Sequence, residues 1–215
     1  MVFGYGADSQ IGRKLMKRLL VATNNPGKLR EMLSLLTDLH LDIVTPQGIG
    51  IQLEPEENGS TYAENASLKA RAFTQASGLV TMADDSGLEV DALGGSPGIR
   101  SARFSPLPHA TDADRRAYLL ELLQDYPPPW KAHFHCTVAI ATPQDEIYFA
   151  QGDCPGVIIV QERGTNGFGY DPIFLLEEAG LTMAELPMDE KNHLSHRARA
   201  VKAAIPILLK LYQQS

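Results

Sequence analysis

LVTMADDSG, at residues 79–87, joins an apolar run to two consecutive carboxylates. Residues 79–83 have the length and composition of a buried strand, and residues 84–87 are rich in turn formers. Ligands of α/β sheets bind beyond the carboxyl ends of strands, and Mg²⁺ usually takes one or two carboxylates together with phosphate oxygens and water. Asp84 and Asp85 therefore indicate a metal–phosphate site, with an acidic turn that only caps backbone groups as the alternative.

A second turn lies upstream, where the apolar run at residues 19–22 ends in TNNPG at residues 23–27. The apolar spacing after it predicts a helix over residues 28–36, with Lys28 in its first turn. Free backbone N–H groups, the helix dipole and an ammonium group all favour an anion at such a point. The segment is not a Walker A loop, because G-x-x-x-x-G-K-[ST] is absent. An ordinary strand-to-helix turn with a surface lysine is the alternative.

The rest of the first half continues this alternation of strand and helix. A strand is expected at residues 41–44, and a helix over residues 61–77. Thr61 and Glu64 fit a capping box at its start, and Gly78 is suited to its end. A further helix should begin at residue 111 or 112 and end near residue 125, before three consecutive prolines.

The second half has a different pattern. Three runs rich in β formers, at residues 132–141, 147–151 and 157–160, are joined by short connections that favour antiparallel pairing. A last helix is expected over residues 191–212, with a kink or break near Ile205 because Pro206 lacks a backbone N–H. Together the halves predict an α/β protein with a mixed sheet. The groove between them is the default ligand site.

A glycine-rich segment, GTNGFGYD, occupies residues 164–171. Glycines let a backbone approach a ligand closely, and Phe168 among them is suited to stacking on a flat base. The spacing differs from the dinucleotide fingerprint G-x-G-x-x-G. A plain β-turn is the alternative.

Charged residues also gather at the start of the last helix, in Glu190-Lys191 and Ser195-His196-Arg197. Lys191 has the reach and charge to meet a phosphate. His196 and Arg197 carry N–H donors for a keto oxygen on a base. A solvated helix surface is the alternative for this segment.

Bulk properties narrow the function classes. The chain has 215 residues and a net charge of −7, which disfavours general binding to nucleic acid. No apolar run approaches the ~18 residues needed to cross a bilayer. Cys136 and Cys154 are far apart, without metal-ligand spacing, which favours reduced thiols and a cytoplasmic location. We expect one domain over residues 17–215, preceded by an extension of uncertain status at residues 1–16.

Five motifs in order resemble the inosine triphosphate pyrophosphatase family, also described as the dITP/XTP pyrophosphatases. The matching text is ATNNPGKLREM at residues 22–32, TYAENASLKARAF at 61–73, ADDSGLEVDALGGSPGIRSARF at 83–104, GTNGFGYDPIF at 164–174 and ELPMDEKNHLSHRARA at 185–200. The similarity covers residues 17–211. One motif alone is modest evidence, but five in sequence are strong.

The resemblance implies an elongated mixed β-sheet flanked by helices, two lobes with a central active-site groove, a homodimer and dependence on Mg²⁺. Its implied triphosphate contacts are Thr23, Asn24, Asn25, Pro26, Gly27, Lys28 and Lys69. Its implied contacts to the rest of the nucleotide are Ser86, Phe168, Gly169, Tyr170, Asp171, Lys191, His196 and Arg197. Asp85 is the implied catalytic and metal-binding carboxylate, and Glu56 is the candidate second metal ligand.

The reaction that follows is hydrolysis of purine nucleoside triphosphates such as ITP, dITP and XTP to the monophosphate and pyrophosphate. Arg197 is donor-only, so it favours a 6-keto purine over adenine, whose amine would lack an acceptor. Two alternatives stay open: a pyrophosphatase for other modified nucleotides, and a regulator that binds a triphosphate without cleaving it. Two adjacent carboxylates argue against the regulator, because they hinder phosphate binding unless a metal is present.

Overall fold

The computed structural model describes residues 17–213, so the extension predicted at residues 1–16 lies outside the described part. The described residues form a seven-stranded sheet in the order β2-β1-β3-β4-β5-β6-β7. β1 runs parallel to β2 and β3, whereas every later pair is antiparallel. The strands are β1 (Arg18–Val21), β2 (Asp42–Val44), β3 (Val80–Val90), β4 (Trp130–Ala141), β5 (Ile147–Ile158), β6 (Phe174–Leu176) and β7 (Leu181–Thr182). The prediction of a mixed sheet is confirmed.

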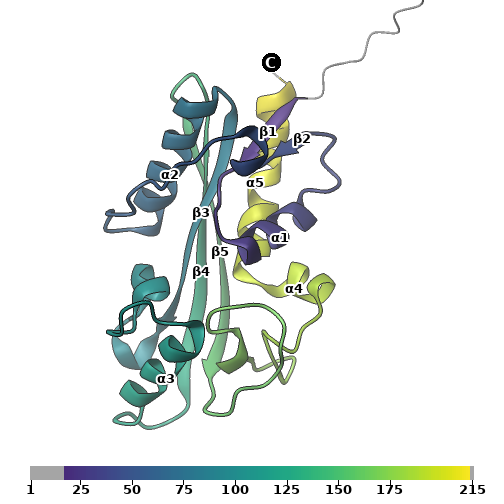
Figure 1. Cartoon of the computed structure of the whole chain (residues 1–215). Helices are drawn as coiled ribbons and strands as arrows, with labels where there is room; N and C mark the ends of the chain where they lie inside the picture. The colour runs from purple at the N-terminus through teal and green to yellow at the C-terminus, as the bar shows by residue number, and fades with distance from the viewer. Residues whose placement is uncertain (1–16, 214–215) are drawn as a thin grey trace, which may run out of the picture.

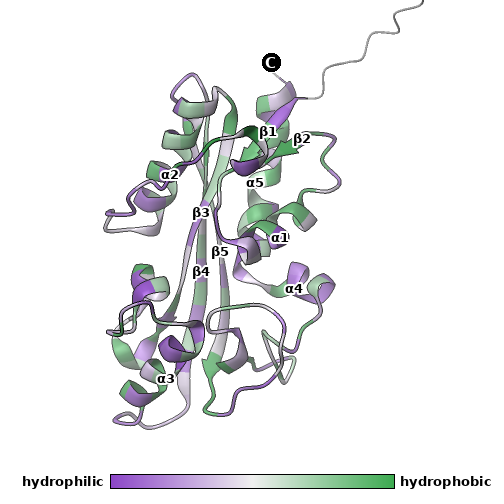
Figure 2. Ribbon diagram, viewed as in Figure 1, coloured by the Kyte–Doolittle hydropathy of each residue, from purple (hydrophilic) through white to green (hydrophobic). Residues whose placement is uncertain are grey.

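Helices cover both faces of this sheet. They are α1 (Pro26–Leu35), α2 (Tyr62–Ser77), α3 (Asp112–Leu123), α4 (Met188–Leu194) and α5 (His196–Gln213). The apolar side of α2, with Phe73, packs on one face of β3 and β4. The apolar sides of α1 and α5 pack on the opposite face. Figure 2 shows the alternation of apolar and polar residues along these helices that produces the two packed layers.

The long strands β3, β4 and β5 run the length of the molecule and carry a group of elements at each end (Figure 1). We call the end with β1, β2, α1, α2 and α5 the first lobe. The end with α3 and the segment around β6 is the second lobe, whose core includes Leu119, Trp130 and Phe174. The elongated two-lobed α/β architecture was predicted from the sequence. No helix among residues 17–213 is long and apolar enough to cross a membrane.

The two aspartates do not lie in a turn, and that prediction was wrong. β3 continues through them to Val90, with Asp84 opposite Val138 and Asp85 opposite Thr137 on β4. The long antiparallel ladder therefore overrides the local turn preference of these residues. Gly87 is needed there for close approach, since a Cβ would lie 2.2 Å from the Gly98 carbonyl oxygen.

β5 is likewise a single strand, although the sequence suggested two. Its middle pairs with β4 without interruption, from Gln151 opposite Thr137 to Gly156 opposite Ala132. A Cβ at Gly152 would lie 2.4 Å from the His196 carbonyl oxygen and 2.5 Å from the Ala200 nitrogen. The glycine therefore lets α5 pack directly on the strand.

The C-terminal helix divides at Ser195 and not near Ile205, where the sequence predicted the break. Ser195 has an extended backbone, and its hydroxyl accepts a hydrogen bond from the Ala198 N–H at 3.2 Å. It thus ends α4 and caps α5. Pro206 stays inside α5 on the exposed side, where solvent can satisfy the carbonyl that loses its N–H partner.

Candidate active site

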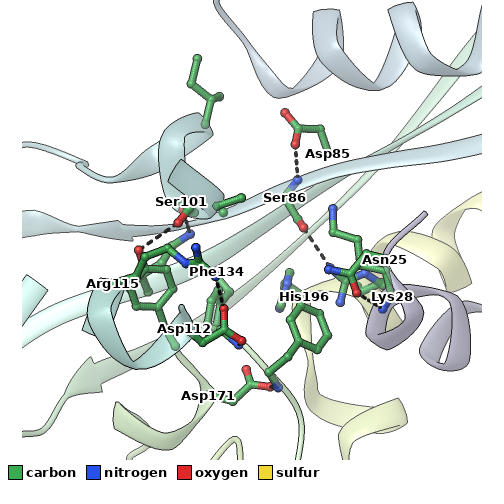
Figure 3. A pocket seen from close by; sticks show the side chains of 18 of the residues that line it. Asn25, Lys28, Asp85, Ser86, Ser101, Asp112, Arg115, Phe134, Asp171 and His196 are labelled. Carbon is green, nitrogen blue, oxygen red and sulfur yellow. Dashed lines mark hydrogen bonds and ion pairs between the residues drawn. The ribbon is translucent and has the colours of Figure 1, made fainter. Parts of the chain in front are cut away.

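The candidate site lies where β1 ends beside β3. Along β3, β1 pairs with Val80–Met82, whereas β3 continues for eight more residues to Val90. Beyond Met82 the described part of the chain places no strand on that side of β3, and a pocket opens there. Figure 3 shows side chains from both lobes around it: Ser86 of β3 lies on the same side of the strand as Asp112 and Asp171, and Asp85 points to the opposite side.

The turn after β1 brings Asn25 and Lys28 to the pocket. The Asn25 Oδ1 accepts hydrogen bonds from the backbone N–H groups of Gly27 and Lys28, at 2.8 and 3.1 Å. Asn25 thus caps the helix N–H groups that were predicted to meet an anion, and the ammonium group of Lys28 becomes the main positive contact on offer. Thr23, Asn24 and Pro26 do not line the pocket, and they support the turn around it.

Behind this turn lies a buried cluster of charges. Lys28 Nζ lies 3.1 Å from Asp84 Oδ2, and Arg197 Nε lies 3.1 Å from the same oxygen. Arg197 also pairs with Glu31, which pairs with Lys191 at 2.7 Å. Burial alone would raise the pKa of Asp84, but the charges of Lys28 and Arg197 hold it well below its usual value. Asp84 is therefore a fixed anion that orients cations.

Of the two consecutive aspartates, Asp85 lines the pocket and Asp84 does not. The Asp85 Oδ2 accepts a hydrogen bond from Asn65 Nδ2 at 3.0 Å, and its Oδ1 accepts one from the Ser86 N–H at 2.9 Å. Burial raises the pKa of Asp85 above its usual value, although Lys28 and Asn65 oppose the change. Consecutive strand residues point to opposite faces, so the two aspartates occupy different environments. Asp85 has the access and the basicity that Asp84 lacks.

Lys69 lies behind the pocket wall and does not line it. Its Nζ donates to the Asp84 carbonyl oxygen at 3.1 Å and pairs with Glu57. Burial would lower the pKa of Lys69, but Asp84 and Glu57 raise it overall. The lysine therefore remains charged and holds Glu57 at the pocket, where that carboxylate is a lining residue.

The structure brings Glu57 to the site rather than the predicted Glu56. Glu56 is exposed and does not line the pocket, because alternate residues of this extended segment point in opposite directions. No group of three or more His, Cys, Asp or Glu side chains in residues 17–213 is arranged to hold a metal ion. Mg²⁺ commonly needs only one or two carboxylates when phosphate oxygens complete its shell. Asp85 and Glu57 fit that requirement.

At the other end the pocket is aromatic. The His196 ring stacks on Phe134 with centroids 4.7 Å apart and an interplanar angle of 16°. Its Nδ1 is buried and has no hydrogen-bond partner among the described residues. Burial, helped by the charges of Arg197 and Lys191, lowers the pKa of His196 well below its usual value. The ring is therefore neutral, with one nitrogen free to meet a ligand.

Residues 164–171, which we call the glycine loop, close this end. Phe168, Gly169, Tyr170 and Asp171 all line the pocket. The Asp171 Oδ2 accepts hydrogen bonds from the Phe168 N–H at 3.0 Å and from Lys191 Nζ at 2.7 Å. A buried carboxylate such as Asp171 would be costly without these partners. Burial alone would lower the pKa of Lys191, but the charges of Asp171 and Glu31 raise that pKa overall. Lys191 is thus a charged support beneath the loop.

Arg197 is almost completely occupied by the protein itself. Its Nε, Nη1 and Nη2 donate to Asp84, Glu31 and, at 2.9 Å, the Ser86 hydroxyl. A guanidinium carries five N–H groups, so about two remain for a ligand. The residue lines the pocket under the Phe168 ring, 5.6 Å from its centroid.

Sequence reasoning missed Glu31 and Asn65, which hold the predicted residues, and it preferred Glu56 over the neighbouring Glu57. Glu31 is 3% exposed and lies beside Met32 on the buried side of α1. A carboxylate on the apolar side of a helix was the available signal, because such a group is rarely buried without a partner. Asn65 gives a similar signal, because it is a polar residue fully buried in α2, where its amide donates to Asp85.

The chain is similar to known proteins over most of its length. The model of the Ham1 family matches residues 19–207. A protein of Listeria monocytogenes named dITP/XTP pyrophosphatase is 45% identical over 188 residues, which cover 87% of this chain and 92% of the relative. One from Shigella flexneri with the same name is 46% identical and covers 90% of this chain and 98% of the relative.

Solved structures agree. A HAM1 protein from Coxiella burnetii superposes with a TM-score of 0.82 and 38% identity, and the match covers 91% of this chain and 100% of that protein. A structure from Mycobacterium abscessus, described as nucleoside-triphosphatase and dITP/XTP pyrophosphatase, has a TM-score of 0.70 and 41% identity, covering 88% and 99% of the two chains.

Proposed function

The chain belongs to the Ham1 family, and we propose that it hydrolyses non-canonical purine nucleoside triphosphates (ITP, dITP and XTP) to the monophosphate and pyrophosphate, which cleanses the nucleotide pool. The observation that carries this proposal is the position of Asp85. It is a pocket-lining carboxylate of raised pKa between a cationic turn and an aromatic end. That arrangement suits a triphosphate on one side and a base on the other.

In the proposed reaction a water molecule attacks the α-phosphorus. The bond from that phosphorus to the bridging oxygen breaks, and pyrophosphate leaves with the oxygen. Asp85 accepts the proton of the water, for which its raised pKa suits it better than Asp84. Lys28 balances charge on the phosphates. Asp85 and Glu57 would hold Mg²⁺, which would supply further charge stabilisation. A carboxylate that coordinates the ion directly is a poorer base, so the two roles need not both belong to Asp85.

Base selection rests on His196 and Arg197. The neutral imidazole offers its unpartnered Nδ1, and Arg197 offers its remaining N–H groups. The Arg197 N–H groups, together with His196 Nδ1 in the tautomer that carries its proton there, favour the 6-keto oxygen of hypoxanthine and xanthine and leave the 6-amine of adenine without an acceptor. Such a mismatch costs about 1–3 kcal/mol. GTP also has a 6-keto group, so its rejection would depend on the 2-position.

We also propose that the enzyme depends on Mg²⁺, acts as a homodimer and works in the cytoplasm, where its substrates would arise. Light scattering at micromolar concentration tests the dimer. A mass near twice 23.5 kDa supports it, and a mass near one chain removes it.

A nucleotide panel tests the proposed activity. ITP, dITP, XTP, GTP, ATP and a modified pyrimidine triphosphate are incubated with the protein and Mg²⁺, and pyrophosphate and nucleotide products are quantified. We expect equal amounts of monophosphate and pyrophosphate from ITP and XTP, little from ATP, and none after EDTA. Preference for the pyrimidine would favour a different substrate class. Tight nucleotide binding without any product would favour a regulator.

A further inference from the structure

The glycine loop is tied to α3 through the backbone of Gly169, and to the segment before α3 through the Tyr170 hydroxyl, which donates to the Ser101 carbonyl at 3.0 Å. The Gly169 backbone N–H donates to the Asp112 Oδ2 at 2.8 Å, and its carbonyl accepts from Arg116 Nη1 at 2.8 Å. Asp112 and Arg116 lie one turn apart at the start of α3, so they present their side chains on the same side of the helix. The first turn of α3 therefore grips both peptide groups that border Gly169.

Neither oxygen of Asp112 is left without a partner in this arrangement. Oδ2 accepts the Gly169 N–H, while Oδ1 pairs with Arg115. Burial alone would raise the pKa of Asp112, but the hydrogen bonds from Arg115 and Gly169 lower it overall. Although Asp112 lines the pocket, its carboxylate is thus committed to holding the loop.

Arg116 is fixed in turn by Glu162, just before the loop. Its Nε and Nη2 lie 2.8 and 2.9 Å from the two carboxylate oxygens of Glu162. The Arg116 side chain is only 12% exposed. A bidentate pair of this kind has a well-defined geometry. One arginine thereby ties the start of the loop and Gly169 to the same helix.

This matters because Gly169 cannot hold its neighbours by itself. It has a φ of 63°, and a Cβ there would meet nothing within 4 Å. Glycine is thus present for its left-handed backbone, and it is also the residue with the greatest conformational freedom. Its two peptide groups carry Phe168 on one side and Tyr170 on the other, and both line the pocket. External hydrogen bonds must supply the rigidity.

We propose that Asp112 and Arg116 are positioning residues that set the orientation of Phe168 through the peptide groups of Gly169. They also fix the backbone of Tyr170, whose ring is held in addition by its hydrogen bond to the Ser101 carbonyl. What the aromatic residues then contact, the purine base, rests on the proposed function. These hydrogen bonds to Gly169 should affect nucleotide binding rather than the phosphate chemistry at Asp85, because Asp85 lies on β3 and Asp112 and Arg116 lie on α3.

The test uses the full chain with Asp112→Ala, Asp112→Asn and Arg116→Gln. Arg71→Gln is the control, because it breaks an ion pair with Asp145 away from the pocket. Amide hydrogen exchange of the peptide covering residues 163–171 is measured without any nucleotide. KM and kcat for ITP and the Kd of pyrophosphate are then compared.

We expect faster exchange of that peptide in Asp112→Ala and Arg116→Gln, and no change in the control. KM for ITP should rise about three- to tenfold, the factor expected for one hydrogen bond, while kcat and pyrophosphate affinity change less than about twofold. Asp112→Asn keeps an acceptor oxygen and should be closer to wild type. Unchanged loop exchange, or an equal loss of ITP and pyrophosphate binding, would overturn the proposal. If wild type does not hydrolyse ITP, the proposed function fails, but the exchange data still decide whether the grip exists.

Discussion

The two sides of the pocket are held in different ways. On the side of the first lobe, Asp84, Arg197 and Glu31 are almost fully buried and paired with one another. On the side of the second lobe, the glycine loop has one buried ion pair, Asp171 with Lys191, and its contacts to the rest of that lobe are hydrogen bonds from Gly169 to Asp112 and Arg116 and from Tyr170 to Ser101. Buried charges that lose a partner are costly, whereas a single lost hydrogen bond costs little.

This difference separates a frame of fixed charges, which holds Lys28 for the phosphates and Arg197 for the base, from a loop that completes the base-binding surface. A reacting phosphate needs charges that do not move, because preorganised groups stabilise developing charge without reorganisation. A base needs a fitted surface, which a loop can supply and evolution can alter at low energetic cost. The following changes test this division, from the side of the charges toward the side of the loop.

Replacement of Asp85 by Asn should have the largest effect. The amide keeps the shape and can still accept from Asn65, but it cannot take a proton from water. We expect kcat to fall by about 10²–10⁴-fold with the melting temperature within a few degrees of wild type. Steady-state pyrophosphate release checks the rate. Asp42→Asn is the control, since Asp42 pairs with Arg18 at the exposed edge of the sheet. Near-normal turnover of Asp85→Asn would remove this residue from the mechanism.

Replacement of Arg197 by Met should damage folding most. It leaves Asp84 and Glu31 buried with fewer cations, and we expect a loss of about 3–5 kcal/mol in the free energy of unfolding. Urea denaturation measures it. Arg199→Met is the matched control, because Arg199 lies two residues along the same helix, is exposed, and donates to the Asp153 carbonyl and not to a buried carboxylate. Equal, small losses in both variants would show that the buried cluster is not a structural requirement.

Gly27→Ala acts across the two sides. A Cβ at Gly27 would lie 2.4 and 2.7 Å from ring atoms of Phe168. Because of this contact the ring must move or the turn must shift, at a cost of about 1–3 kcal/mol. The cost would appear even though alanine is otherwise favoured over glycine in a helix. We expect weaker ITP binding and lower stability by calorimetry. The double variant with Phe168→Leu should recover the stability. An alanine variant more stable than wild type would mean that this contact does not join the two sides.

His196 gives the smallest effect, a change of stability with pH. Its pKa in the folded protein is lowered below the unfolded value of about 6.5. Above that pH both states are neutral, and as pH falls below it only the unfolded state gains the proton. Stability should therefore fall by about 1.4 kcal/mol per pH unit from this group. Urea denaturation at pH 7.5 and 5.5 should show a smaller loss in His196→Asn. Identical losses would contradict a neutral buried ring.

The sequence predicted which helices and strands form better than it predicted where each of them begins and ends. Thr61 and Gly78 bound α2 as expected, because caps are local chemistry. The course of β3 through Asp84 and Asp85 was missed, since the antiparallel partner β4 that sustains it lies some fifty residues away, with Asp85 opposite Thr137. Residue type and motif order sufficed to nominate Lys28, Asp85 and His196 for the site.

The supporting residues were beyond reach for a related reason. Glu31 and Asp112 hold partners from distant segments, and a single sequence does not say which segments meet. The choice between Glu56 and Glu57 depends on which way an irregular segment points, and only the fold sets that direction.

In the proposed binding mode the phosphates lie near Lys28 and Asp85 and the base lies near the glycine loop, so the α-phosphate, where the reacting bond is, lies between them. Hydrolysis of ITP in ¹⁸O-labelled water tests this directly, with mass spectrometry of both products. We expect one labelled oxygen in the monophosphate and none in the pyrophosphate. Label in the pyrophosphate, or release of labelled orthophosphate, would contradict attack at the α-phosphorus and the placement of the nucleotide that follows from it.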